Sequence, residues 1–83
     1  MKTLKDTEKM MQSEDFKERF RAEYFQLKIR MEGLRGILVK LKEGTLPFTP
    51  KSSYDLLHGQ FKAMDLYASY LEERALIESI SLD

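Results

Sequence analysis

The sequence predicts an all-α fold in which two long helices form an antiparallel hairpin behind a short N-terminal helix. Apolar residues recur at spacings of three and four on both sides of a single break near position 47, which is the period of amphipathic helices. The chain has only four glycines and two prolines, and 34% of its residues are charged. Such a composition is typical of helices with solvated outer faces.

The first long helix is predicted over residues 14–43. Its apolar seam alternates steps of four and three residues, the heptad pattern of a helix that packs along a partner helix. Ser13 is the expected N-cap, and Gly44 suits the C-cap because glycine adopts a positive φ without a Cβ clash. The seam contains Phe20, Tyr24, Leu27, Met31, Leu34, Leu38 and Leu41.

The second long helix is predicted over residues 52–81, after a loop at 44–51 whose two prolines prevent the first helix from continuing. Ser52 and Ser53 are candidate N-caps. This helix carries two adjacent apolar rows. The first row contains Leu57, Phe61, Met64, Ala68, Leu71 and Ala75. The second row contains Leu56, Ala63, Tyr67, Tyr70 and Ile77.

Two adjacent rows are wider than one partner helix covers, so the sequence predicts a homo-oligomer. The chain has 83 residues and no cysteine, and therefore lacks disulfides and thiolate metal sites to stabilise a small core. The alternative is a monomeric hairpin with exposed aromatic side chains. We prefer the oligomer because an isolated pair of helices encloses no core.

The segment 1–12 is predicted to be a short helix or arm, separate from the hairpin at 13–83. Thr3 and Asp6 have the spacing of a capping box, which favours helix initiation. A helix this short is marginal in water because its nucleation is costly. We therefore expect it to be ordered by docking on the hairpin.

Composition and motifs exclude several classes of function. Basic and acidic residues number 14 each, and this balance disfavours DNA or RNA binding. No apolar run reaches the roughly 18 residues of a membrane span, and no signal peptide precedes the first helix, so we expect a cytoplasmic protein. The sequence has no phosphate-binding glycine loop, no nucleophile elbow and a single histidine, His58. We predict no catalytic residue, no metal and no cofactor.

Three patterns are compatible with a binding function. Gly33 and Gly36 lie within one helical turn, where each costs about 1 kcal/mol relative to alanine, which predicts the close approach of another helix or of a ligand. Aromatic residues such as Tyr24 can stack on a nucleobase beside an arginine. Basic residues also recur every seventh position, and either pair with acids of the neighbouring helix or offer donors to an anion between subunits. These basic residues are Arg21, Lys28, Arg35 and Lys42.

Motifs in both long helices resemble a known family. The first is the opening Phe16-Lys17-Glu18-Arg19-Phe20, followed by Glu23, Leu27 and Leu34. The second runs through Leu57, Gln60, Ala63, Met64, Tyr67, Leu71 and Arg74. Over residues 16–78 the chain resembles the phage helical-hairpin family that includes the anti-CBASS and anti-Thoeris cyclic-nucleotide sponges.

The resemblance implies a homo-oligomer, often a hexamer, with ligand pockets between subunits. Such pockets would bind cyclic di- or trinucleotides and sequester them without cleavage, which blocks bacterial antiviral signalling of the CBASS type. On this chain the resemblance makes Phe16 the candidate stacking ring, and Arg19, Arg30 and Arg74 the candidate phosphate and base-edge donors.

Tyr24 and Arg35 join these candidates from the aromatic and basic patterns described above. The alternative function is a protein-binding hairpin that uses its spare apolar face to inhibit or connect other host or phage proteins. An enzyme is not expected. The sponge needs an aromatic ring and arginines that converge at a subunit boundary, whereas the adaptor needs an apolar stripe that oligomerisation leaves open.

Overall fold

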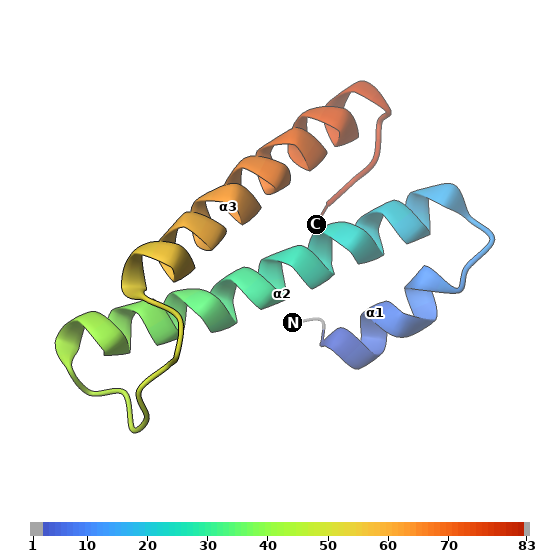
Figure 1. Ribbon diagram of the computed structural model, residues 1–83. Coiled ribbons are helices and arrows are strands. Elements are labelled where there is room, and N and C mark those ends of the chain that lie inside the picture. The colour runs from blue at the N-terminus through green and yellow to red at the C-terminus, as the bar shows by residue number, and fades with distance from the viewer. Residues whose placement is uncertain (1–2, 83) are drawn as a thin grey trace.

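The computed structural model describes residues 3–82, and this part of the chain contains three α-helices and no strand. The predicted all-α class is therefore confirmed. Positions 1, 2 and 83, at the outer ends of the two predicted segments 1–12 and 13–83, lie outside the described residues. The helices are α1 (Leu4–Met11), α2 (Phe16–Glu43) and α3 (Tyr54–Ile77) (Figure 1).

Local side-chain and backbone geometry explains where the helices start and stop. The backbone N–H of Asp6 donates to the Thr3 hydroxyl (3.2 Å), and the Asp6 carboxylate accepts from the Thr3 N–H (3.0 Å). This confirms the predicted capping box. The Ser53 hydroxyl caps α3 by accepting from Leu56 N–H at 3.1 Å. Gly44 ends α2 in the left-handed region with φ of 75°, as expected for a C-cap glycine.

Helix α2 begins two residues later than its predicted range of 14–43 because Asp15, rather than Ser13, is its N-cap. The Asp15 carboxylate accepts a hydrogen bond from the Lys17 N–H at 2.9 Å. The Ser13 hydroxyl instead donates to the Glu18 carboxylate at 3.1 Å. A carboxylate is favourable at this position because the helix N-terminus carries partial positive charge.

Helix α3 ends at Ile77, before the predicted end of the 52–81 range. The chain reverses at Ser79, whose φ is 57°, and the Ile80 N–H then donates to the Ala75 carbonyl at 2.8 Å. This turn directs Ile80 back into the core, where its side chain is buried. The tail after α3 therefore folds back toward α2 instead of extending the helix (Figure 1).

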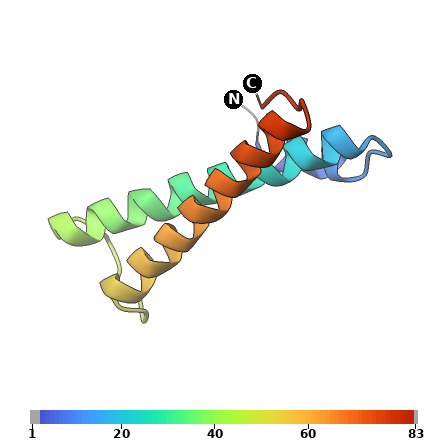
Figure 2. The same cartoon turned by 90° about the horizontal axis from the view of Figure 1, so that it is seen from above.

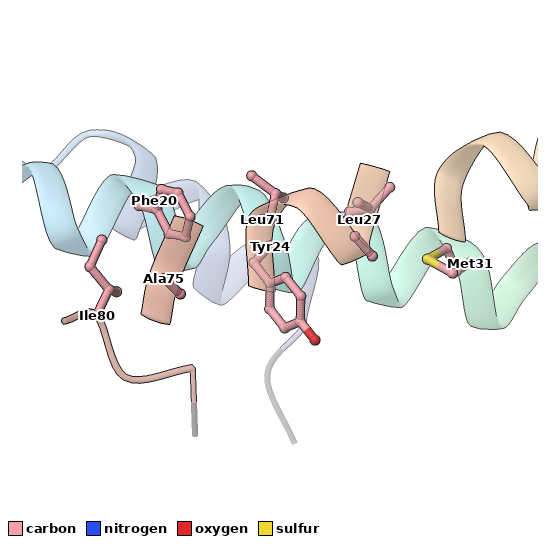
Figure 3. Packing of buried hydrophobic residues seen from close by; sticks show 8 residues of the cluster. Phe20, Tyr24, Leu27, Met31, Leu71, Ala75 and Ile80 are labelled. Carbon is pink, nitrogen blue, oxygen red and sulfur yellow. The ribbon is translucent and has the colours of Figure 1, made fainter. Parts of the chain in front are cut away.

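Helix α2 is central to the fold and packs against both other helices, whereas α1 and α3 do not contact each other. In Figure 1, α3 and α1 lie on opposite sides of α2, and Figure 2 shows that α2 and α3 cross at an angle. The core cluster, shown in part in Figure 3, contains Phe20, Tyr24, Leu27, Met31, Ala68, Leu71, Ala75 and Ile80.

The contact between α1 and α2 involves small side chains. Thr7, the buried residue of α1, and Ala22 of α2 are both completely buried and lie outside the core cluster. The Thr7 hydroxyl donates to the Leu4 carbonyl at 2.7 Å, so its polar atom is satisfied without a partner on α2. Small residues at these positions allow the two helix backbones to approach closely.

Candidate functional site

An arginine and two aromatic rings meet where the start of α2 lies beside the end of α3. The guanidinium carbon of Arg74 lies 4.9 Å from the centroid of the Phe20 ring, within the range of a cation–π interaction. The Phe20 ring in turn lies 6.3 Å from the Phe16 ring, centroid to centroid. Phe20 is only 3% exposed, whereas Phe16 is 47% exposed. We call Phe16, Phe20 and Arg74 the aromatic–arginine cluster.

The guanidinium of Arg74 is oriented by a second contact and retains donors for a ligand. Its Nε lies 3.4 Å from the Glu78 carboxylate, one turn later on the same face. A guanidinium has five N–H donors, and this contact uses only the one on Nε. The terminal nitrogens of Arg74 are therefore available to an anion on the ring of Phe20, whose other aromatic neighbour is the exposed ring of Phe16.

Tyr24 lies one turn after Phe20 and connects α2 to α3 from within the core (Figure 3). Its hydroxyl donates to the Glu72 carboxylate at 2.5 Å. Burial, reinforced by the hydrogen bond and negative charge of Glu72, raises the pKa of Tyr24 to about 12. Tyr24 is therefore a neutral donor already bonded to Glu72, placed to support the cluster rather than to present its ring to solvent.

The remaining predicted arginines lie on the exposed surface of α2. Arg19 is at the same end as Phe16, and its Nη1 donates to the Ser13 carbonyl at 2.7 Å. Arg30 and Arg35 follow about 15 Å and 22 Å beyond Phe20 along the helix axis. Arg35 forms an ion pair of 3.8 Å with Glu32 of its own helix.

Within one chain, only two of the six predicted site residues, Phe16 and Arg74, belong to the same cluster, because both contact Phe20. Phe20 was predicted as a seam residue and not as part of the site. Its spacing of four residues from Phe16 was a usable signal, because residues i and i+4 are neighbours on a helix surface. Its contact with Arg74 depends on how α3 crosses α2.

A concave region lies at the other end of the helix pair, about 33 Å from Phe20 along α2. It is an open depression of about 420 Å³ lined by Leu41, Lys42, Tyr54 and Asp55. The Lys42 ammonium lies 5.5 Å from the centroid of the Tyr54 ring. This region also combines a cation with an aromatic ring, but the Tyr54 ring is stacked on its own helix neighbour His58.

The close approach predicted at Gly33 and Gly36 does not occur within one chain. A Cβ atom added at either position would meet no heavy atom within 4 Å. Both glycines lie on exposed surface of α2. Packing inside the chain therefore does not explain them.

Residues 3–82 contain neither a metal site nor a membrane-spanning helix. No group of three or more His, Cys, Asp or Glu side chains there is arranged to hold a metal ion. None of the helices is both long and apolar enough to cross a membrane.

Comparison with known proteins gives one match. No curated protein sequence and no solved structure matches significantly. The family model described as Sequestin matches residues 14–77, which covers the whole of α2 and α3. This match agrees with the resemblance of the sequence to phage sponge proteins. Since the match covers well over half of the chain, the protein belongs to the Sequestin family.

Proposed function

We propose that this protein is a phage-encoded sponge that binds a cyclic di- or trinucleotide and sequesters it without cleavage, which blocks antiviral signalling of the CBASS type in the host cytoplasm. The family description, Sequestin, suggests sequestration of a molecule and supports this proposal. The observation that carries the proposal is that the ring of Phe20 contacts both the guanidinium of Arg74 and the exposed ring of Phe16.

The aromatic–arginine cluster suits the chemistry of a cyclic nucleotide. A nucleobase is flat and stacks on an aromatic ring such as Phe16, at about 1–3 kcal/mol per base. A phosphate accepts charge-assisted hydrogen bonds from a guanidinium such as that of Arg74. Because Phe20 is buried and contacts both groups, the cluster is organised before the ligand arrives, which reduces the entropic cost of binding.

We further propose that the two-helix hairpin formed by α2 and α3 assembles into a homo-oligomer, a hexamer by family resemblance. The second apolar row of α3 supports this, because its large residues Leu56, Tyr67, Tyr70 and Ile77 are exposed. Arg30 and Arg35 lie too far from Phe20 along α2 to reach the same phosphate in one chain. In an assembly they would contribute to a pocket from a neighbouring copy.

The experiment is titration calorimetry against a panel of 3′,3′-linked cyclic dinucleotides and cyclic triadenylate. At least one panel member should bind, and it should be recovered intact after the complex is heated. Recovery of a hydrolysed ligand would identify an enzyme. If no panel member binds at high micromolar concentration, the sponge assignment is wrong.

The second candidate is a protein-binding hairpin that acts as an inhibitor or adaptor, and the exposed second row of α3 also favours it. The two candidates differ in what covers that row. In a homo-oligomeric sponge, other copies of the chain would cover it. An adaptor would keep the row open, and light scattering would then give the mass of a single 9.8 kDa chain.

A further inference from the structure

Helix α3 carries an apolar row that is exposed in the single chain. We call Leu56, Ala63, Leu66, Tyr67, Tyr70 and Ile77 the outer row. Its large side chains are between 44% and 76% exposed. They lie on a different side of the helix from Ala68, Leu71 and Ala75, which face the core. Helix α1 does not contact α3, so no other helix covers the outer row.

We propose that two copies of the chain pair through their outer rows, with the two α3 helices antiparallel and the midpoint between Leu66 and Tyr67. The pairing places Gly59 of each copy beside Arg74 of the other. This inference rests on the proposed function only in assigning a ligand to Arg74. The pairing itself follows from the exposed apolar residues of α3 and the charges beside them.

The order of residues along the outer row supports this register. Around the midpoint, each apolar residue meets another apolar residue, and the small alanine meets the large tyrosine, so the two surfaces are complementary in size. The three facing pairs are Leu56 with the partner's Ile77, Ala63 with the partner's Tyr70, and Leu66 with the partner's Tyr67.

Charges beside the outer row select the antiparallel orientation. Lys62 and Glu73 are both exposed and lie on the same flank of the row. In the antiparallel register, Lys62 of one copy lies within about 3 Å, along the helix axis, of the partner's Glu73. In a parallel pair in register, this flank would face the opposite flank of the partner helix, so Lys62 and Glu73 would not meet each other. Flanking charges of this kind determine orientation in paired helices.

The same register gives Gly59 a role. A Cβ atom on Gly59 would meet no heavy atom within 4 Å in its own chain, so packing within the chain does not require a glycine there. In the pair, Gly59 opposes the partner's Arg74, and its missing side chain leaves space for the guanidinium on the Phe20 ring. A ligand at the aromatic–arginine cluster would then touch both copies.

Cysteine cross-linking tests the pairing directly, because the natural chain contains no cysteine. Chains carrying Ala63→Cys and Tyr70→Cys are mixed, oxidised without ligand and analysed on a non-reducing gel. The mixture should give a disulfide-linked dimer because these positions face each other. Ala63→Cys alone should remain monomeric on the gel, since its two copies would be about 10 Å apart along the axis, beyond the roughly 7 Å Cα separation that a disulfide spans.

The control replaces Tyr70→Cys by Ser69→Cys, which is exposed but outside the outer row and should not cross-link to Ala63→Cys. Circular dichroism verifies that each variant is folded. A disulfide dimer from Ala63→Cys alone would show a parallel pair and overturn the proposal. No dimer in the Ala63→Cys and Tyr70→Cys mixture would overturn it as well. Since no ligand is present, neither result bears on cyclic-nucleotide binding.

A further variant tests the position of Gly59. Gly59→Leu, added to both cysteine chains, should slow cross-linking at least tenfold because the new side chain occupies the space beside the partner's Arg74. Leucine is the better helix former, so slower cross-linking would not reflect loss of α3. An unchanged cross-linking rate would show that Gly59 does not face Arg74.

Discussion

The guanidinium carbon of Arg74 lies 4.9 Å from the centroid of the Phe20 ring, although the two residues belong to different long helices. This contact brings together two segments that are distant in the chain. The Phe20 ring is buried, and its other aromatic neighbour, Phe16, is exposed. Its consequences for binding, pH dependence and assembly are open to direct tests.

Removing Arg74 should weaken nucleotide binding and leave the fold intact. A charge-assisted hydrogen bond contributes about 1.5–3 kcal/mol, so Arg74→Ala should raise the Kd of a bound panel member about 10- to 150-fold. Arg21→Ala is the matched control, because it removes the same charge near the same end of α2 but outside the aromatic–arginine cluster. Calorimetry gives both values. Equal affinities for the two variants would place the ligand elsewhere.

Replacing the aromatic ring of Phe16 should also weaken ligand binding, by about 5- to 150-fold, because stacking on an aromatic ring is worth about 1–3 kcal/mol per base. Phe16→Leu removes the ring and keeps an apolar side chain, so it separates base stacking from general burial. Calorimetry should show weaker ligand binding for Phe16→Leu than for the natural protein. Full affinity in Phe16→Leu would mean that the ring does not stack on a base.

The Tyr24 hydroxyl should make stability fall at high pH. The pKa of Tyr24 rises from 10.0 to about 12 in the folded protein, so the folded state holds this proton more tightly than the unfolded state. The resulting stabilisation is complete below pH 10 and is lost as the pH rises toward 12. Urea denaturation at pH 9, 10.5 and 11.5 should show this loss.

Tyr24→Phe provides the control for the pH effect. It removes the hydrogen bond to Glu72, at a cost of about 1 kcal/mol, and keeps the ring in the core. Its free energy of unfolding should fall less steeply above pH 10 than that of the natural protein. The same slope in both proteins would show that other groups cause the alkaline loss of stability.

A charge in the core should unfold the protein. Leu71 is 1% exposed, and Leu71→Asp leaves a buried carboxylate without a partner, at a cost of at least about 3–5 kcal/mol. Leu34 is only half-buried and lies outside the core cluster, so Leu34→Asp should cost less. Leu76→Asp is the control, since Leu76 is 84% exposed. Circular dichroism should show loss of helix for Leu71→Asp and retention for Leu76→Asp.

A charge in the outer row should disrupt assembly without unfolding the chain. Light scattering should give a mass several times 9.8 kDa for the natural protein. Tyr70→Arg should reduce that mass because it places a charge in an apolar interface, whereas Ser69→Arg, one residue away and outside the row, should not. A natural protein that is monomeric at micromolar concentration would refute the oligomer.

The sequence by itself determined the features of this fold that depend on near neighbours in the chain. The capping box of Thr3 with Asp6 and the left-handed C-cap at Gly44 involve residues within one turn, so residue type and spacing predict them. The heptad spacing also identified Phe20, Tyr24 and Leu27 as core residues, and all three are buried. Periodicity predicts burial because a helix repeats its faces regularly.

Only the tertiary structure decided which face of α3 meets α2. Both rows of α3 have helical spacing, so periodicity alone does not rank them. The row with Ala68, Leu71 and Ala75 packs on α2, because its two alanines allow close approach of the backbones, and the outer row is left exposed.

That choice rotates Glu72 toward Tyr24 and Arg74 toward Phe20, contacts across more than forty residues of chain that no local pattern specifies. The separation of Arg30 and Arg35 from the cluster, by contrast, follows from the sequence, because both lie on the same predicted helix as Phe20, about 15 Å and 22 Å further along its axis. Which residues of α3 reach Phe20 depends on the packing of two helices, and spacing along the chain does not specify it.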